Sequence, residues 1–161
     1  MSKIKKLHKP KLQVSLQEME EKEIDELFND AINYFNIGDT DFMYTSLHMF
    51  HTVIEKNPDY IAKHNKKYSY LSDGDNAYYY LGILYQQNMD DLDSAINFFS
   101  KSVELSPDDY DSLFLRGVCW SDKNEHGKAL DDFKMAKKLG GNDVNYDVDS
   151  AIEESEKRLK S

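Results

Sequence analysis

Histidines are the residues of this chain whose type and spacing could do metal chemistry. His48 and His51 are three residues apart and can share one face of a helix, with His64 as a third ligand. A zinc site needs three or four ligands, and further hydrogen bonds must hold those ligands in place. Packing or surface positions explain the histidines better than such a site, so we expect neither a metal ion nor a cofactor.

Paired aspartates and the single cysteine are the other candidates for chemistry. The aspartates stand at the predicted starts of helices, where carboxylates cap free N–H groups, and none has the spacing of an EF-hand calcium loop. Cys119 stands beside Trp120 in a predicted helix, and we expect it to pack rather than to react. The sequence also lacks a glycine-rich phosphate loop, a nucleophile elbow and a cysteine pair, so we predict that the protein is not an enzyme. The aspartates are Asp39, Asp41, Asp73, Asp75, Asp90, Asp91 and Asp93.

Charge is distributed unevenly along the 161 residues. The net charge is −10, but residues 1–12 carry five lysines and no acid, so the rest of the chain carries −15. Such an acidic body argues against nucleic-acid binding and favours a basic partner or simple solubility. No apolar run has the length of a signal peptide or of a membrane span, and the lone cysteine is typical of a reducing compartment. We therefore expect a cytoplasmic protein that does not contact membranes.

Residues 75–107 show the pattern of the helices that must position these candidate residues. Tyr78, Leu81, Gly82 and Tyr85 are spaced three, one and three apart, so they share one helix face. A glycine inside a helix costs about 1 kcal/mol relative to alanine, and Gly82 therefore predicts close approach by the backbone of a second helix. That helix presents a matching face and ends before a proline, which disfavours helical backbone in the residue before it. The matching residues are Ala95, Phe99, Ser102 and Pro107.

The same pattern recurs at a spacing of 34 residues. Ala95, Phe99 and Ser102 correspond to Ala129, Phe133 and Ala136. In the preceding helix, Gly82 corresponds to Gly117 at a spacing of 35 residues. The later copy departs in two places, with Arg116 in the leucine position and Gly141 in the proline position. An earlier and weaker copy has Asp30 in the leucine position. Its matching residues are Leu27, Ala31, Tyr34, Ser46, Phe50 and Pro58.

These residues and their period resemble those of the tetratricopeptide repeat family. The resemblance implies an all-α fold, an α-solenoid of antiparallel helix pairs that forms a right-handed superhelix of about seven helices. We expect a mobile basic tail over residues 1–16 and a single domain over 17–161. Within that domain we expect repeat 1 over about 20–58, an insertion over 59–74, repeat 2 over 75–108, repeat 3 over 109–142 and a capping helix over 144–159.

Helix ends and the insertion can be predicted more closely. Ser15 and Glu18 have the spacing of a capping box, which predicts one helix from Ser15 to Gly38. The insertion either extends the preceding helix, forms a helix of its own or remains a solvated linker. A functional alternative is a lid at the mouth of a groove, because insertions in repeat proteins gather on one face. In the capping helix, Val148, Ile152 and Leu159 would share the apolar face.

In the tetratricopeptide family the first helices of the repeats line a concave surface that binds peptides. The resemblance places nine residues of this chain on that surface, and most are apolar or aromatic. None is the lysine, arginine or asparagine that family members use to hold a chaperone's C-terminal carboxylate, so we do not expect that ligand. An amphipathic helix or an extended apolar segment suits the surface better. The nine residues are Phe28, Ile32, Phe35, Tyr79, Ile83, Gln86, Phe114, Val118 and Ser121.

The resemblance thus implies a non-enzymatic adaptor or chaperone that binds another protein or peptide, as a monomer or weak homodimer. Repeat number, length and acidity are also similar to those of small secretion chaperones, although the long insertion departs from that pattern. Two alternatives remain open at this point. The chain's own N-terminal segment or capping helix could fill the groove. The acidic body could instead belong to an immunity protein or antitoxin that neutralises a basic enzyme.

Overall fold

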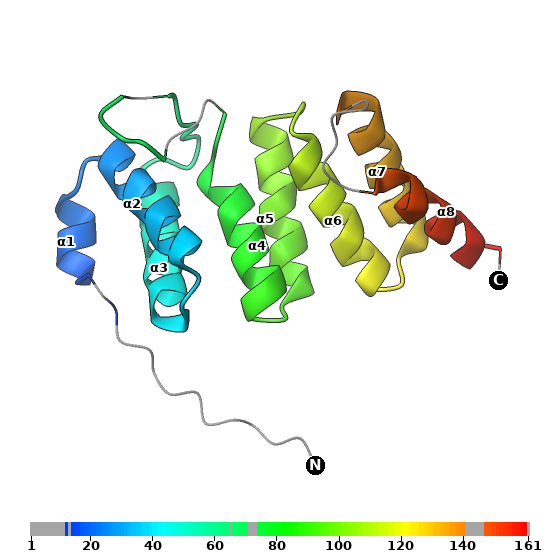
Figure 1. The fold of residues 1–161 in the computed structure, drawn as a ribbon, viewed down its shortest axis with the longest axis horizontal. Coiled ribbons are helices and arrows are strands. Elements are labelled where there is room, and N and C mark those ends of the chain that lie inside the picture. The colour runs from blue at the N-terminus through cyan, green and yellow to red at the C-terminus, as the bar shows by residue number, and fades with distance from the viewer. Residues whose placement is uncertain (1–11, 13, 65, 71–73, 141–146, 161) are drawn as a thin grey trace, which may run out of the picture.

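A computed structural model describes residues 12, 14–64, 66–70, 74–140 and 147–160 (Figure 1). Eight α-helices form within these residues, and the sequence led us to expect about seven. Three antiparallel pairs stand side by side in a row, with one further helix at each end (Figure 1). The helices are α1 (Leu16–Glu21), α2 (Ile24–Ile37), α3 (Thr40–Lys56), α4 (Ala77–Asn88), α5 (Leu92–Leu105), α6 (Tyr110–Asp122), α7 (His126–Gly140) and α8 (Val148–Arg158).

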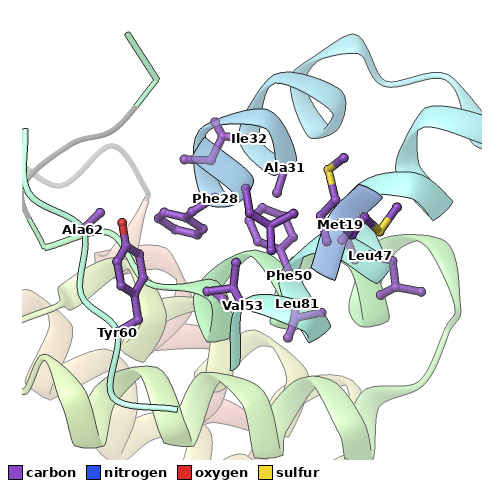
Figure 2. Packing of buried hydrophobic residues seen from close by; sticks show 14 of the residues in the cluster. Met19, Phe28, Ala31, Ile32, Leu47, Phe50, Val53, Tyr60, Ala62 and Leu81 are labelled. Atoms are coloured by element: carbon purple, nitrogen blue, oxygen red, sulfur yellow. The ribbon is translucent and has the colours of Figure 1, made fainter. Parts of the chain in front are cut away.

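The pairs α2/α3, α4/α5 and α6/α7 confirm the three predicted repeats. Each second helix also packs against the helix that follows it, so that α3 contacts α4, α5 contacts α6 and α7 contacts α8. The buried apolar side chains form three clusters along the row, and the largest joins α1, α2, α3, α4 and the insertion (Figure 2). The second lies between α4, α5 and α6, and the third between α6, α7 and α8.

The repeat glycines are needed for contact with an aromatic ring. A Cβ atom on Gly82 would lie 2.5 Å from the ring of Phe99, and one on Gly117 would lie 2.7 Å from the ring of Phe133. Both distances are too short for two carbon atoms. The sequence therefore predicted a close approach correctly, but the approaching group is a side chain of the paired helix, not its backbone. In repeat 1 the equivalent position holds Ala31, which is fully buried.

The predicted helix from Ser15 to Gly38 is wrong, because the chain turns at Lys22. Its backbone is extended there (φ −71°, ψ 146°), which ends α1 and lets α2 begin at Ile24. The capping box is confirmed at the start of α1, where Ser15 and Glu18 exchange hydrogen bonds. This break produces the additional helix. It places Met19 of α1 in the core against α3, where the side chain is fully buried.

The prediction of a helix in the insertion is also wrong for the part that the structure describes. Helix α3 ends at Lys56, and two backbone hydrogen bonds close the base of the insertion, from Ala62 N to Asp75 O (2.7 Å) and from Gly74 N to Ala62 O (3.0 Å). Tyr60 and Tyr68 are buried. The described part of the insertion is therefore a loop packed on the body of the protein, and is neither a helix nor a solvated linker.

Both ends of the chain depart in detail from expectation. Residues 1–11 and 13 of the predicted tail lie outside the described residues, whereas Ser15 is the N-cap of α1. Helix α8 begins at Val148, and residues 141–146 are likewise outside the described part. Val148 and Ile152 share an apolar face as predicted and pack toward Phe133, but Leu159 is 55% exposed and does not share that face.

Candidate functional site

The nine residues predicted for the concave surface lie on the first helices α2, α4 and α6, and α4 contacts α6 directly. They are not equally accessible. Phe28, Ile32 and Ile83 are buried and belong to the core. The other six are half-buried, and they form what we call the concave strip. The concave strip consists of Phe35, Tyr79, Gln86, Phe114, Val118 and Ser121.

The chain's own insertion closes the N-terminal end of this surface. The ring of Phe28 makes edge contacts with Phe50 (5.6 Å between centroids), Tyr60 (5.3 Å) and Tyr80 (5.9 Å), and Figure 2 shows Tyr60 of the insertion beside it. Tyr60 Oη donates a hydrogen bond to Asp25 Oδ1 at 2.6 Å, which ties the insertion to α2. The tyrosine-rich composition of the insertion was the only sequence signal for this contact.

The middle of the strip is aromatic and carries an unsatisfied polar atom. Phe35 and Tyr79 pack on the cluster of Ile83 and Phe99, with their outer faces partly accessible. Gln86 Oε1 is buried, and within the part of the chain that the structure describes it accepts no hydrogen bond. A buried acceptor left without a donor costs about 1–3 kcal/mol. The atom is enclosed in the protein, so the half-buried Gln86 side chain would have to turn outward to present this acceptor to an arriving N–H or O–H donor.

Helix α8 occupies the C-terminal end of the strip. Phe114 and Val118 pack against the cluster that contains Phe133 and Val148, and Phe114 lies 5.3 Å from Phe133 between ring centroids. Val148 comes from α8, so this helix covers part of the surface that the sequence assigned to a ligand. The two ends of the predicted surface are thus in contact with other parts of the chain, and the middle lies between them.

An acidic cavity of about 490 Å³ adjoins the strip at Tyr79. It lies where α4 and α6 begin. At its floor the side chains of Asn76 and Asp109 accept hydrogen bonds from the backbone N–H groups of Tyr79 and Ser112, respectively, and so cap the two helices. Sequence analysis missed this cavity, although the run Asp108-Asp109-x-Asp111 was a signal for it. The lining residues are Gly74, Asp75, Asn76, Tyr79, Tyr80, Ser106, Asp108, Asp109 and Asp111.

Among the candidate metal ligands His51 has an ordinary packing role, and so has the cysteine. His51 contacts Tyr85 and Phe98, and burial lowers the pKa of its imidazole. His48 is exposed on the same helix. Among the described residues no three histidine, cysteine, aspartate or glutamate side chains gather as a metal site would require. Cys119 is buried as predicted, and burial, with Asp122 nearby, raises the pKa of its thiol to about 12, so the thiolate is scarce at neutral pH.

Comparisons with known proteins agree with this architecture. No protein-family model and no curated relative matches the sequence, and none of the described helices has the length and apolarity to cross a membrane. Solved structures do match. The type III secretion translocator chaperone SycD of Yersinia enterocolitica superposes with a TM-score of 0.67 at 17% identity, over 86% of each chain. SycD has also been solved with a peptide of the translocator YopD.

Two further matches are tetratricopeptide domains bound to chaperone peptides. The first such domain of Spaghetti (RPAP3), bound to an HSP90 peptide, has a TM-score of 0.66 at 14% identity over 86% of this chain and 94% of that one. The TPR2B domain of yeast Sti1, in complex with Hsp70, has a TM-score of 0.63 at 14% identity over 84% and 97%. Identities this low establish the fold alone. By its fold, this chain is a tetratricopeptide-type helical-repeat protein.

Proposed function

We propose that the chain is a non-enzymatic adaptor or chaperone that binds a segment of another protein on its concave strip. The fold supports this function, because SycD, RPAP3 and Sti1 have been solved with peptides of other proteins. A cytoplasmic location fits the proposal, because the chain's one cysteine is a free thiol that packs in the core.

The middle of the strip is the observation that carries the proposal. Phe35 and Tyr79 provide partly accessible rings, and the half-buried Gln86 has a buried acceptor, Oε1, without a donor in the described residues. A partner backbone N–H would satisfy this acceptor once the Gln86 side chain turns outward, while apolar side chains of the partner cover the rings. Each interaction alone contributes little free energy of binding. Together, the aromatic surface selects the composition of the partner segment and the directed hydrogen bond selects its orientation.

The ligand that fits is a short apolar segment. The insertion and α8 close the two ends of the surface, so the occupant must be accommodated between them. None of the six strip residues carries a positive charge, which leaves a C-terminal carboxylate without a partner in the strip. An extended apolar stretch or one face of an amphipathic helix meets these conditions.

Quantitative capture from cytoplasm with the tagged chain tests the proposal. Phe35→Ala/Tyr79→Ala removes the two rings, and Met135→Ala/Leu139→Ala is the matched control because these residues are exposed on α7, away from the strip. We expect one dominant partner that the strip variant loses by at least tenfold and the control retains. Because the contact is apolar, capture should persist in high salt. Equal capture by the two variants contradicts the proposal.

Gln86→Leu sharpens the same experiment. This change keeps the size of the side chain and removes the acceptor, so the free protein should become no less stable. Partner affinity should nevertheless fall about three- to tenfold, since one hydrogen bond contributes about 0.5–1.5 kcal/mol. If affinity rises instead, the acceptor is not used by the partner.

A second candidate function rests on the acidic cavity. Four carboxylates line it, from Asp75, Asp108, Asp109 and Asp111, and they would attract a basic enzyme of the kind that an immunity protein or antitoxin neutralises. Salt distinguishes the two functions. A partner captured by the strip variant, but lost in high salt and lost on Asp108→Asn, would favour the acidic surface.

A further inference from the structure

An apolar pocket of about 340 Å³ lies between α3 and α4, and the concave strip contributes no residue to it. Leu47 and Leu84 are buried in it, whereas Met43 and Tyr44 are half-buried and Met89 is 36% exposed. An open pocket with such a lining leaves apolar surface in water unless a side chain covers it. The full lining is Thr40, Met43, Tyr44, Leu47, Leu84, Asn88 and Met89.

Acidic residues flank this pocket in the chain. Asp39 and Asp41 stand on either side of Thr40, and Asp90 follows Met89. The Asp39 carboxylate caps the start of α3, and both Asp39 and Asp90 are exposed at the surface. The matching occupant therefore has one or two apolar side chains with positive charges on either side of them.

The sequence of residues 1–11 has this composition. Ile4 and Leu7 are three residues apart, and the lysines at positions 3, 5, 6, 9 and 11 surround them. The segment leads into Val14, which packs against the same apolar cluster that contains Met43, Tyr44, Leu47 and Leu84. Figure 1 shows that α1 begins at the end of the molecule where the α2–α3 and α4–α5 turns also lie.

The segment is also long enough to reach the pocket. Val14 is seven positions after Leu7, and an extended chain spans about 3.3 Å per residue, so Leu7 reaches about 23 Å. Helix α3 has 17 residues and a length of about 25 Å. Leu7 can therefore reach most positions along α3 from the point at which Val14 joins the cluster.

We propose that residues 1–11 dock in this pocket of the same molecule. Leu7, or Ile4 beside it, covers Met43 and Met89, and the flanking lysines lie near Asp39, Asp41 and Asp90. The pocket is then an internal binding site for a basic, apolar segment. This inference does not rest on the proposed function, because no residue of the strip takes part.

Methionine methyl resonances test the docking in the full chain. The chain has six methionines, of which Met43 and Met89 line the pocket, while Met19 and Met49 are buried elsewhere and Met135 is exposed on α7. We expect Leu7→Asp to move the Met43 and Met89 resonances and to leave the other three in place. Ser2→Asp is the matched control, since it adds the same charge outside the apolar pair. Unmoved Met43 and Met89 resonances overturn the proposal, and the Met19 and Met49 resonances report whether the variant has folded.

Disulfide trapping then distinguishes docking within one molecule from docking between two. In a Cys119→Ala background, Leu7→Cys/Met89→Cys should form an intramolecular disulfide, because bonded cysteines need Cα atoms about 4.4–6.8 Å apart. Leu7→Cys/Met135→Cys is the control and should form at least tenfold less. Cross-linked dimers in place of monomers would assign the pocket to a second copy and overturn the proposal. Equal cross-linking in the two pairs would overturn it as well.

Discussion

At the position where repeat 2 carries Leu81, repeat 3 carries Arg116. Leu81 is fully buried, and Phe98 of the paired helix packs on the same cluster. Arg116 donates to both carboxylate oxygens of Asp132, at 2.8 and 2.6 Å, and to Ser100 Oγ at 3.1 Å. Asp132 lies 34 residues after Phe98, so repeat 3 has an ion pair at the two positions that in repeat 2 belong to one apolar cluster. The two repeats therefore share a helix arrangement and not the chemistry of this contact.

Repeat 1 has a third arrangement at the same position, in which an aspartate pairs with a lysine. Asp30 accepts a hydrogen bond from Lys22 at 2.6 Å, and Lys22 stands in the break between α1 and α2. Burial acts to lower the pKa of Lys22, but hydrogen bonds to Asp30 and Glu26 outweigh it and raise the pKa to about 12. A charged residue is thus accepted in the leucine position wherever the fold supplies an opposite charge.

Placing the charge of repeat 3 in repeat 2 should have the largest effect. Leu81→Arg puts a cation among buried apolar side chains, where Phe98 stands in the place of Asp132. Loss of more than about 4 kcal/mol of unfolding free energy is expected, because an unpaired buried charge is among the most destabilising changes. Urea unfolding followed by circular dichroism measures it.

The double variant Leu81→Arg/Phe98→Asp is the control for that experiment. It restores the ion pair of repeat 3, so it should be more stable than Leu81→Arg alone although less stable than the natural chain. If the added aspartate brings no recovery, the equivalence between the two repeats does not hold at this contact.

Breaking the natural ion pair should have the next largest effect. Asp132→Ala leaves Arg116 without its carboxylate, at a site where the arginine side chain is 20% exposed. Partial access to water should hold the loss to about 2–3 kcal/mol, below the 3–5 kcal/mol of a fully buried pair. The double variant Arg116→Leu/Asp132→Phe copies repeat 2 and should be neutral or more stable by about 1–4 kcal/mol. A strongly destabilised double variant would show that the repeat 3 site is shaped for the ion pair.

The same contacts explain which parts of the fold the sequence could predict and which it could not. The repeat pattern, with a period of 34 residues between repeats 2 and 3, correctly predicted three helix pairs, because the small and aromatic residues that interlock within a pair recur in each copy. The pair formed by Arg116 and Asp132 was not predicted, since the period marks Arg116 only as a departure and does not indicate its partner. The break at Lys22 was missed because neither proline nor glycine lies between Ser15 and Gly38 to indicate it. Only the tertiary position of Met19 shows why the chain turns.

Prediction of the site was limited by contacts from outside the repeats. Helical spacing correctly placed Phe28 and Phe114 on first helices, but it could not show that Tyr60 of the insertion covers the former or that α8 packs beside the latter. Both covering elements lie in segments without the repeat pattern. Their placement depends on single contacts, such as the hydrogen bond from Tyr60 to Asp25, which leave no periodic signal.

The repeat glycines should behave alike in repeats 2 and 3, despite the difference at Leu81 and Arg116. Gly82→Ala and Gly117→Ala each push a methyl group into a buried phenylalanine ring, and each should cost about 1–3 kcal/mol after the gain in helix propensity. Gly127→Ala is the matched control, because nothing lies within 4 Å of its added carbon, and it should be neutral or slightly stabilising. Thermal unfolding of the three variants and of the natural chain measures these changes in stability. A large difference between the first two would show that one ring can move aside.

Alkaline pH should weaken the junction between repeat 1, the insertion and repeat 2. Burial is the main cause that raises the pKa of Tyr60 and of Tyr80, and the nearby carboxylates of Asp25 and Asp75 add to it. The folded state therefore holds these phenol protons more tightly than the unfolded state. Their contribution to stability is complete below pH about 10, the ordinary tyrosine pKa, and is lost as the pH rises toward the raised values.

Unfolding free energies between pH 9 and 11 provide the measurement. Cys119→Ala is the required background, because burial also raises the pKa of that thiol to about 12 and would add its own slope. Each tyrosine can lower the unfolding free energy by at most about 1.4 kcal/mol per pH unit. Tyr60→Phe/Tyr80→Phe should flatten the decline, although it loses the hydrogen bond to Asp25 at neutral pH. A decline that the double variant leaves unchanged would mean that other groups govern the alkaline limit, and that the aromatic junction tolerates ionised tyrosine as repeat 3 tolerates Arg116.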